Sequence, residues 1–144
     1  MVRASEAAGA VVRAVLIHQD ADGMDHGPAC EAQIERDFAG IAKNLNGMPV
    51  VPVVMMESWW FLFPDAVEAL KQAWRGLIPR HPQNVEYINA PKRELQRNTR
   101  GSKPQHQYAE SDSPAIAAKV RELGLVPNGT SPSYDRFVAR VKTI

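Results

Sequence analysis

The sequence has very little cysteine and no long apolar run, and each absence excludes a class of protein. Cys30 is the only cysteine among 144 residues, which excludes an internal disulfide and a metal site built from clustered cysteines. One cysteine is typical of a reducing compartment, so we expect a cytoplasmic protein. No apolar stretch approaches the roughly 20 residues of a membrane-spanning helix. We therefore expect no membrane partner.

The sequence also lacks an excess of either charge. Its 17 basic and 16 acidic residues give a formal net charge of +1, so the totals indicate no nucleic-acid partner and any such site must be a local cluster. The chain is 44% hydrophobic and 23% charged, ordinary values for a soluble globular protein. The length suits a single domain over residues 1–144.

Two aspartates end the first apolar segment of the chain. The residues Val11 to Gln19 predict a buried strand, and Asp20 and Asp22 follow it at once. In open α/β sheets, binding sites collect beyond the carboxyl ends of the strands. Two carboxylates this close repel each other unless water or a cation lies between them. The pair therefore indicates a divalent-metal site or, more simply, a polar turn that ends a strand.

A helix and a second strand follow the aspartate pair. Residues 28–46 predict a helix whose apolar stripe consists of Cys30, Ile34, Phe38, Ile41 and Leu45. Residues 48–56 predict a second buried strand, and Glu57 follows it. Strand, helix and strand in this order form a right-handed parallel crossover. Glu57 and the aspartate pair would then lie at one edge of the sheet, where their oxygens suit Mg²⁺ or Mn²⁺.

The remainder of the chain predicts helices and one basic loop. Residues 58–78 predict a helix that opens with the apolar cluster 59–63, which we assign to the core, and that Pro64 breaks or restarts. A short strand is expected at 84–88, and helices are expected at 90–97, at 113–123 and after Ser131. Basic residues gather in the helix expected at 90–97 and in the loop that follows it: Lys92, Arg93, Arg97, Arg100 and Lys103. Such a run is either a solvated face or a grip on phosphates.

Three segments together resemble the Toprim fold of topoisomerases, primases and overcoming-lysogenization-defect nucleases. They are VLIHQDAD at 15–22, MESWWFLFPDAVEAL at 56–70, and QYAESDSPAIAAKV with SPSYDRFV in the tail. Within that fold, the chain more closely resembles a bacterial group of Toprim-like proteins of unassigned function, often encoded near phage-defence genes. Asp20 and Asp22 match the aspartate pair of that group, and Glu57 matches the acidic residue of its E-x-W segment. Tyr108 and Ser133 match tail positions without a defined role.

The resemblance implies a three-layer sandwich with a mainly parallel sheet and two alternative functions. The first is a metal-dependent nuclease, in which Asp20, Asp22 and Glu57 bind Mg²⁺ or Mn²⁺ for phosphodiester hydrolysis. Arg93, Arg97, Arg100 and Lys103 would then hold DNA or another nucleic acid. The second is an inactive interaction subunit that docks on an ATPase, on another subunit of a defence system or on a second copy of itself.

Two departures from the family pattern favour the interaction subunit. The Toprim pattern begins with a strand ending in Glu-Gly, which supplies a catalytic carboxylate, and Glu6 is the only stand-in that this sequence offers. The domain is thus expected to lack the first strand of the family, which another subunit could complete. The family tail often has a lysine where this chain has Glu110. A further alternative takes DADG as a haloacid-dehalogenase motif with Asp20 as nucleophile, although the later motifs of that class are not evident.

Overall fold

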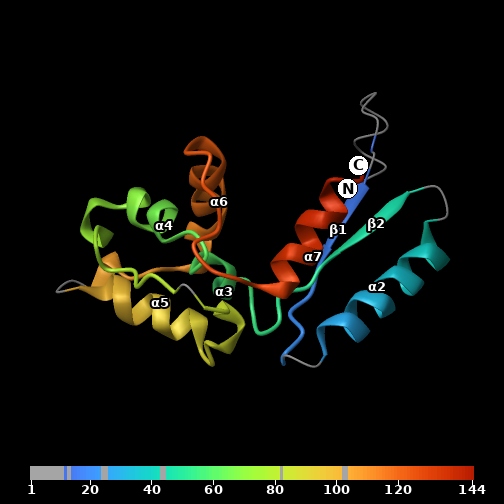
Figure 1. The fold of residues 1–144 in the computed structure, drawn as a ribbon, viewed down its shortest axis with the longest axis horizontal. Helices are drawn as coiled ribbons and strands as arrows, with labels where there is room; N and C mark the ends of the chain where they lie inside the picture. Colours follow the sequence, from blue (N-terminus) through green and yellow to red (C-terminus); the bar gives the residue numbers. More distant parts are fainter. Residues whose placement is uncertain (1–11, 13, 24–25, 43–44, 82, 102–103) are drawn as a thin grey trace.

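The computed structural model describes residues 12, 14–23, 26–42, 45–81, 83–101 and 104–144, and it shows a mixed α/β protein with a small parallel sheet (Figure 1). Strand β1 (Ala14–His18) pairs with β2 (Asn46–Val50), so that Ala14 lies opposite Asn46 and His18 opposite Val50. Helix α2 (Gly27–Ile41) connects the two strands. The predicted order of strand, helix and parallel strand is confirmed. The finer assignment to a Toprim-like sandwich stays a prediction.

Helices α2 and α7 (Pro132–Val141) lie on opposite faces of the two strands. Ile17 and Val51 pack with Ile34 of α2, whereas Leu16 and Val50 line a pocket together with side chains of α7. Neighbouring residues of a strand point to opposite faces, which explains this division. Both helices make their main contacts with β2 rather than with β1.

The segments between β2 and α7 form a helical body beside the strands (Figure 1). Its longer elements are α3 (Glu57–Trp60), α4 (Pro64–Leu70), α5 (Pro91–Arg100) and α6 (Ser113–Glu122). Four short 3₁₀ turns connect them: Gln72–Trp74, Val85–Tyr87, Pro104–His106 and Glu110–Asp112. Proline has no N–H to leave unpaired in a first helical turn. Five of the described helices have a proline at their first or second position: Pro28, Pro64, Pro91, Pro114 and Pro132.

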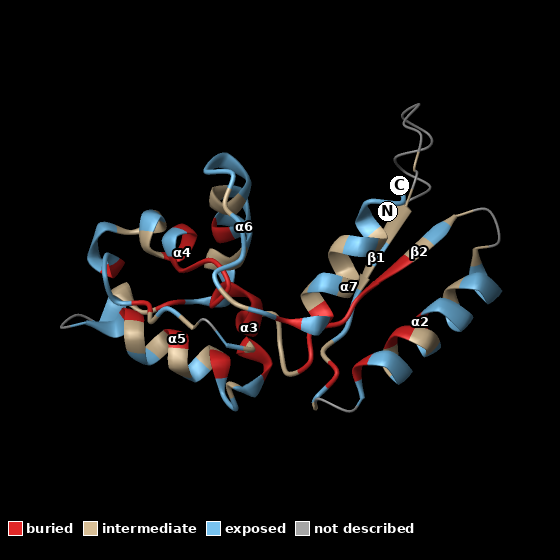
Figure 2. Ribbon diagram, viewed as in Figure 1, coloured by how far each residue is buried: buried red, intermediate tan, exposed pale blue. Residues whose placement is uncertain are grey.

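The core lies around α3 and contains the aromatic cluster that the sequence predicts (Figure 2). All five residues of the segment 59–63 are buried, and Phe61 and Leu62 are fully enclosed. A smaller apolar cluster of Ala21, Ile34 and Val51, with Ile17 and Cys30 at its side, joins α2 to the sheet. The assignment of Cys30 to the packed stripe of α2 is thereby confirmed. Most of the remaining surface of α2 is exposed.

Several predicted element boundaries are wrong. The helix expected to reach residue 46 ends at Ile41, because Asn46 and Gly47 pair with β1 instead. The second strand ends at Val50 rather than at residue 56. The stretch 58–78 forms α3, α4 and a 3₁₀ turn, and α4 begins at Pro64, where the helix was expected to break or restart. The stretch 84–88 forms a 3₁₀ turn instead of a strand, because the Asn84 side chain accepts a hydrogen bond from the Glu86 N–H. Val11 lies outside the described residues.

None of the helices in the described ranges is both long enough and apolar enough to cross a bilayer.

Candidate functional site

Asp20 and Asp22 lie at the carboxyl end of β1, as the sequence predicts. The chain continues past β1 along the segment after β2, with hydrogen bonds from the Ala21 N–H to the Pro52 carbonyl (3.0 Å) and from the Gly23 N–H to the Val53 carbonyl (2.9 Å). A carboxylate oxygen of Asp20 lies 3.1 Å from His18 Nε2. Asp22 has a left-handed backbone (φ 54°), which aspartate tolerates better than most residues. Buried Ala21 separates the two carboxylates along the chain.

Asp22 lines a pocket of about 370 Å³ whose other polar side chains come from much later in the sequence. They include Glu86, which belongs to the 3₁₀ turn Val85–Tyr87, and Asn89, which follows that turn. One oxygen of Glu86 accepts hydrogen bonds from the Ser131 hydroxyl (2.8 Å) and from the Ser133 N–H (2.7 Å). The pocket thus contains two carboxylates and one amide. Sequence analysis missed Glu86 and Asn89, because nothing in the local pattern links residues 86–89 to Asp22.

Glu57 lies in a different environment from the aspartate pair. It opens α3, is 6% exposed, and its carboxylate accepts a hydrogen bond from the Tyr108 hydroxyl at 3.1 Å. The same hydroxyl lies 2.7 Å from Ser113 Oγ. Ser113 Oγ accepts a hydrogen bond from the Trp60 indole at 3.0 Å. Burial, together with the adjacent Glu57 carboxylate, raises the pKa of Tyr108 well above its ordinary value. Tyr108 therefore acts as a neutral donor toward Glu57.

The structure does not gather the three predicted metal ligands into one cluster. Across the described ranges, no group of three or more His, Cys, Asp or Glu side chains is placed to hold a metal ion. The reason is local, because the chain runs without regular structure from Val50 to α3, and Glu57 packs into the helical body. The metal-binding role of Asp20, Asp22 and Glu57 stays a prediction.

Tyr108 and Ser133, two residues from the C-terminal third of the chain, each contact α3. Tyr108 binds Glu57, and Ser133 Oγ accepts a hydrogen bond from the indole of Trp59 at 3.0 Å, from a position 74 residues away. Both contacts are buried. These two residues therefore hold α3 against the tail of the chain.

The basic residues predicted to hold phosphates lie on α5. Arg93, Arg97 and Arg100 are exposed, while Leu95 and Thr99 on the same helix are buried. Arg93 and Arg97 line a pocket of about 280 Å³, and Arg97 also pairs with Glu94 at 3.5 Å. Lys92, which belongs to the same run, pairs with Glu110. Lys103 lies outside the described residues.

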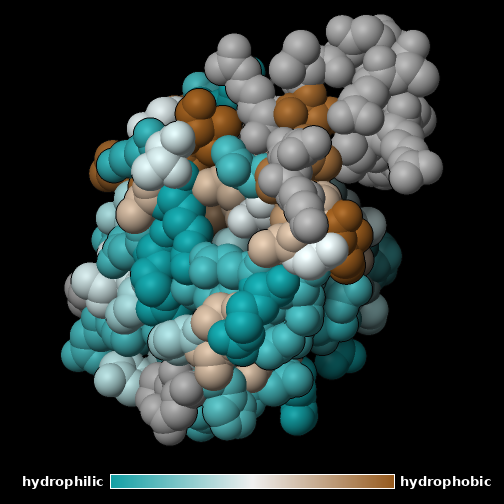
Figure 3. All heavy atoms as spheres, turned by 90° about the vertical axis from the view of Figure 1, so that its right-hand side faces the viewer, coloured by the Kyte–Doolittle hydropathy of each residue, from teal (hydrophilic) through white to brown (hydrophobic). Residues whose placement is uncertain are grey.

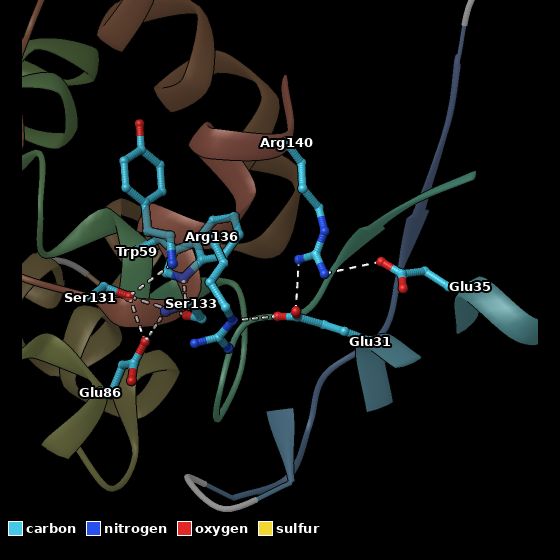
Figure 4. A network of polar contacts seen from close by, with 9 residues as sticks. Glu31, Glu35, Trp59, Glu86, Ser131, Ser133, Arg136 and Arg140 are labelled. Carbon is cyan, nitrogen blue, oxygen red and sulfur yellow. Dashed lines mark hydrogen bonds and ion pairs between the residues drawn. The ribbon is translucent and has the colours of Figure 1, made fainter. Parts of the chain in front are cut away.

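A buried ion-pair network that the sequence did not predict joins α2 to α7 (Figure 4). Glu31 is 4% exposed, and its two oxygens accept hydrogen bonds from Arg136 (2.8 Å) and Arg140 (2.7 Å). Arg140 also reaches the exposed Glu35 at 3.0 Å. The partners of Glu31 lie 105 and 109 residues later in the sequence, so no local pattern in α2 could indicate them.

The outer edge of β1 is a second candidate site. The bond from the Gln19 N–H to the Val50 carbonyl (3.2 Å) fixes the ladder, so the odd-numbered residues of β1 point their backbone groups toward β2. The backbone groups of Ala14, Leu16 and His18 therefore point outward. Among the described residues no third strand pairs with them, because the sheet has the order β1–β2.

The exposed side chain in the middle of this edge is apolar. Leu16 is 58% exposed and lies at the side of an apolar pocket of about 270 Å³, which β2, α3, α6 and α7 also line. Trp59, Trp60, Phe63 and Phe137 contribute to this pocket. An exposed leucine beside such a pocket enlarges the apolar surface next to the open strand edge.

Comparison with protein-family models, with curated proteins and with solved structures gives no match for this chain.

Proposed function

We propose that this chain is a docking subunit, and that the outer edge of β1 receives an extended strand from a partner protein. The observation that carries the proposal is the row of outward-facing backbone groups at Ala14, Leu16 and His18, beside the exposed Leu16 side chain. Backbone hydrogen bonds supply affinity in strand addition, and side-chain pockets supply specificity. The resemblance to Toprim-like proteins supplies the context, a subunit that another protein completes.

The two edges of the sheet differ in the way this proposal requires. Natural edge strands are usually protected by lysine, proline or a bulge, which prevent unwanted pairing. The outer edge of β2 carries Pro49, which lies opposite Ile17 and points its backbone away from β1. The five residues of β1, AVLIH, contain no proline and no lysine. Proline therefore disfavours pairing at the outer edge of β2, while the outer edge of β1 is suited to pairing.

Substitution of Leu16 by proline tests the docking function directly. The outward N–H of Leu16 is not used by β2, so Leu16→Pro removes a donor for the partner while the β1–β2 ladder stays intact. Leu16→Val, which keeps the donor, is the matched control. Each variant is co-expressed with the candidate partner, which is either a differently tagged second copy of this chain or the protein encoded beside it, and the purified complex is quantified after circular dichroism has confirmed the fold.

We expect the complex to form with the wild-type chain and the valine variant and to be lost with the proline variant. Complex formation that is equal in all three would contradict docking at this edge.

The second candidate is metal-dependent phosphodiester hydrolysis, supported by the pocket that contains Asp22, Glu86 and Asn89. Oxygen-rich sites suit Mg²⁺ and Mn²⁺, and a bound ion polarises a phosphodiester and lowers the pKa of an attacking water. Arg93 and Arg97 on the exposed face of α5 are suited to contact phosphates.

Titration with Mg²⁺ tests the second candidate independently of docking. We expect the wild-type protein to release or absorb heat on binding, and we expect the double variant Asp20→Asn, Asp22→Asn to lose this signal. The same proteins are then assayed for cleavage of DNA with Mn²⁺. Equal binding by wild type and double variant would remove the aspartate pair as a metal site.

A further inference from the structure

The occupant of the β1 edge can be specified further, and this step rests on the proposed docking function. We infer that the partner is a second copy of this chain, whose β1 pairs antiparallel with the first across a two-fold axis at Leu16. The product is one continuous four-stranded sheet in the order β2–β1–β1–β2. Two-fold interfaces are the commonest in soluble oligomers and require a surface that complements itself.

Strand β1 complements itself in this register. Leu16 of one copy lies opposite Leu16 of the other, Val15 opposite Ile17, and Ala14 opposite His18. Because the backbone groups of Leu16 point outward, the two leucines form a hydrogen-bonded pair in which each N–H donates to the opposite carbonyl. The paired segment contains no acidic residue, lysine or arginine, so no like charges are placed opposite each other.

The side chains on one face of the new sheet also agree with the pairing. Opposed residues of an antiparallel pair point to the same face, so the two Leu16 side chains would lie together beside the apolar pocket under α7. Each leucine would bury part of the other, and Leu16 is 58% exposed in the single chain. The net charge of +1 per chain adds little repulsion between the copies.

The uneven support of the two strands is a second observation in favour of the pairing. A two-stranded sheet is stabilised by further strands or by packing against helices, and α2 and α7 make their main contacts with β2. β1 is therefore the less supported strand, and a second β1 would supply a neighbour on its outer side. Figure 3 views the molecule from the side of α2, where hydrophilic residues cover most of the surface and hydrophobic residues are scattered over its upper part.

Cross-linking through a cysteine at position 16 tests the register. Leu16→Cys is placed in a Cys30→Ser background, since Cys30 is the only native cysteine, and is treated with a short thiol-to-thiol reagent. Cα atoms of a hydrogen-bonded antiparallel pair lie about 5.5 Å apart, so we expect efficient formation of a covalent dimer. Val126→Cys in the same background is a stringent control, because Val126 is 80% exposed and lies outside the proposed interface.

Sedimentation of the purified chain supplies the second measurement. We expect the wild-type mass to rise from 15.9 kDa to twice that value with increasing concentration, and we expect Leu16→Pro to remain monomeric. A mixture of Ala14→Cys and His18→Cys chains, again without Cys30, should cross-link more than either variant alone, because the register places these residues opposite each other.

Three outcomes decide between the two levels of the proposal. A wild-type chain that stays monomeric, with no more cross-linking at position 16 than at 126, overturns the homodimer. If that monomer still binds the neighbouring gene product and loses it in Leu16→Pro, the docking function stands and only the identity of the occupant is wrong. If no partner binds, both proposals fail.

Discussion

At the scale of single residues, the contacts of Glu57 explain more than its expected chemistry does. A carboxylate that is 6% exposed needs donors, and Tyr108 supplies one from a position 51 residues later. The sequence predicted that Asp20 and Asp22 end a strand, because a short continuous apolar run precedes them. It could not predict the partner of Glu57, because side-chain contacts over such separations depend on how the helices pack.

The Tyr108 hydroxyl is expected to contribute measurably to stability. Tyr108→Phe removes the donor to Glu57 and leaves a buried carboxylate with one hydrogen bond fewer, which should lower the free energy of unfolding by about 1–3 kcal/mol. Urea denaturation measures the change. Tyr87→Phe is the matched control, because Tyr87 is 65% exposed, and its effect should stay within about 0.5 kcal/mol. A similar fall in the free energy of unfolding of both variants would show that the buried Tyr108–Glu57 hydrogen bond does not stabilise the fold.

Stability should also fall at alkaline pH through the same residue. The pKa of Tyr108 is raised in the folded protein, first by burial and then by Glu57, whereas the unfolded chain titrates near the ordinary value of about 10. The stabilising effect is therefore complete below that pH and is lost as the pH rises above it. Burial also raises the pKa of Tyr134, so Tyr108→Phe should reduce the alkaline loss without abolishing it. An unchanged alkaline slope in the variant would contradict this assignment.

At the scale of elements, strand pairing determines where α2 stops. The sequence predicted one helix as far as residue 46, since its apolar stripe continues to Leu45. The structure instead places Ile41 in solvent at 83% exposure and directs Asn46 into β2. The existence and order of strand, helix and strand were predictable from periodicity. The end of the helix was not, because it depends on the tertiary contact between Phe38 and Gly47.

Two glycines in this region should respond to alanine in opposite ways. A Cβ at Gly47 would lie 2.3 Å from the ring of Phe38, whereas a Cβ at Gly40 in α2 meets no atom within 4 Å. We expect Gly47→Ala to destabilise by about 1–3 kcal/mol, because Phe38 must move. Gly40→Ala should stabilise by about 0.5–1 kcal/mol through helix propensity. Thermal or urea unfolding of both variants measures the difference, and equal effects would refute the close packing of Phe38 on Gly47.

The ion pairs between α2 and α7 should matter because Glu31 is buried. Glu31→Gln leaves Arg136 and Arg140 without their shared carboxylate. Their side chains are 33% and 28% exposed, so water can solvate them in part. We therefore expect a loss of about 1–3 kcal/mol in urea denaturation. Glu35→Gln, at a position that is 49% exposed, should cost at most about 1 kcal/mol. A larger loss for Glu35 than for Glu31 would contradict the role of the buried carboxylate.

At the scale of the whole molecule, the proposed function depends on the difference between the two edges of the sheet. Pro49 disfavours strand pairing at the outer edge of β2, whereas Ala14, Leu16 and His18 leave the outer edge of β1 suited to pairing. The sequence predicted a domain that lacks the first strand of the resembling family and that another subunit could complete. It could not show which edge is open, because that depends on the side of β1 to which β2 pairs.

Amide hydrogen exchange in β1 tests the open edge most directly. Val15 and Ile17 point their N–H groups toward β2, so their exchange should be slow at every protein concentration. The N–H of Leu16 points outward, so its exchange should be fast in dilute solution and should slow as the concentration rises and a second β1 pairs with it. A Leu16 amide that exchanges at one rate over the whole concentration range and after addition of the neighbouring gene product would contradict the account.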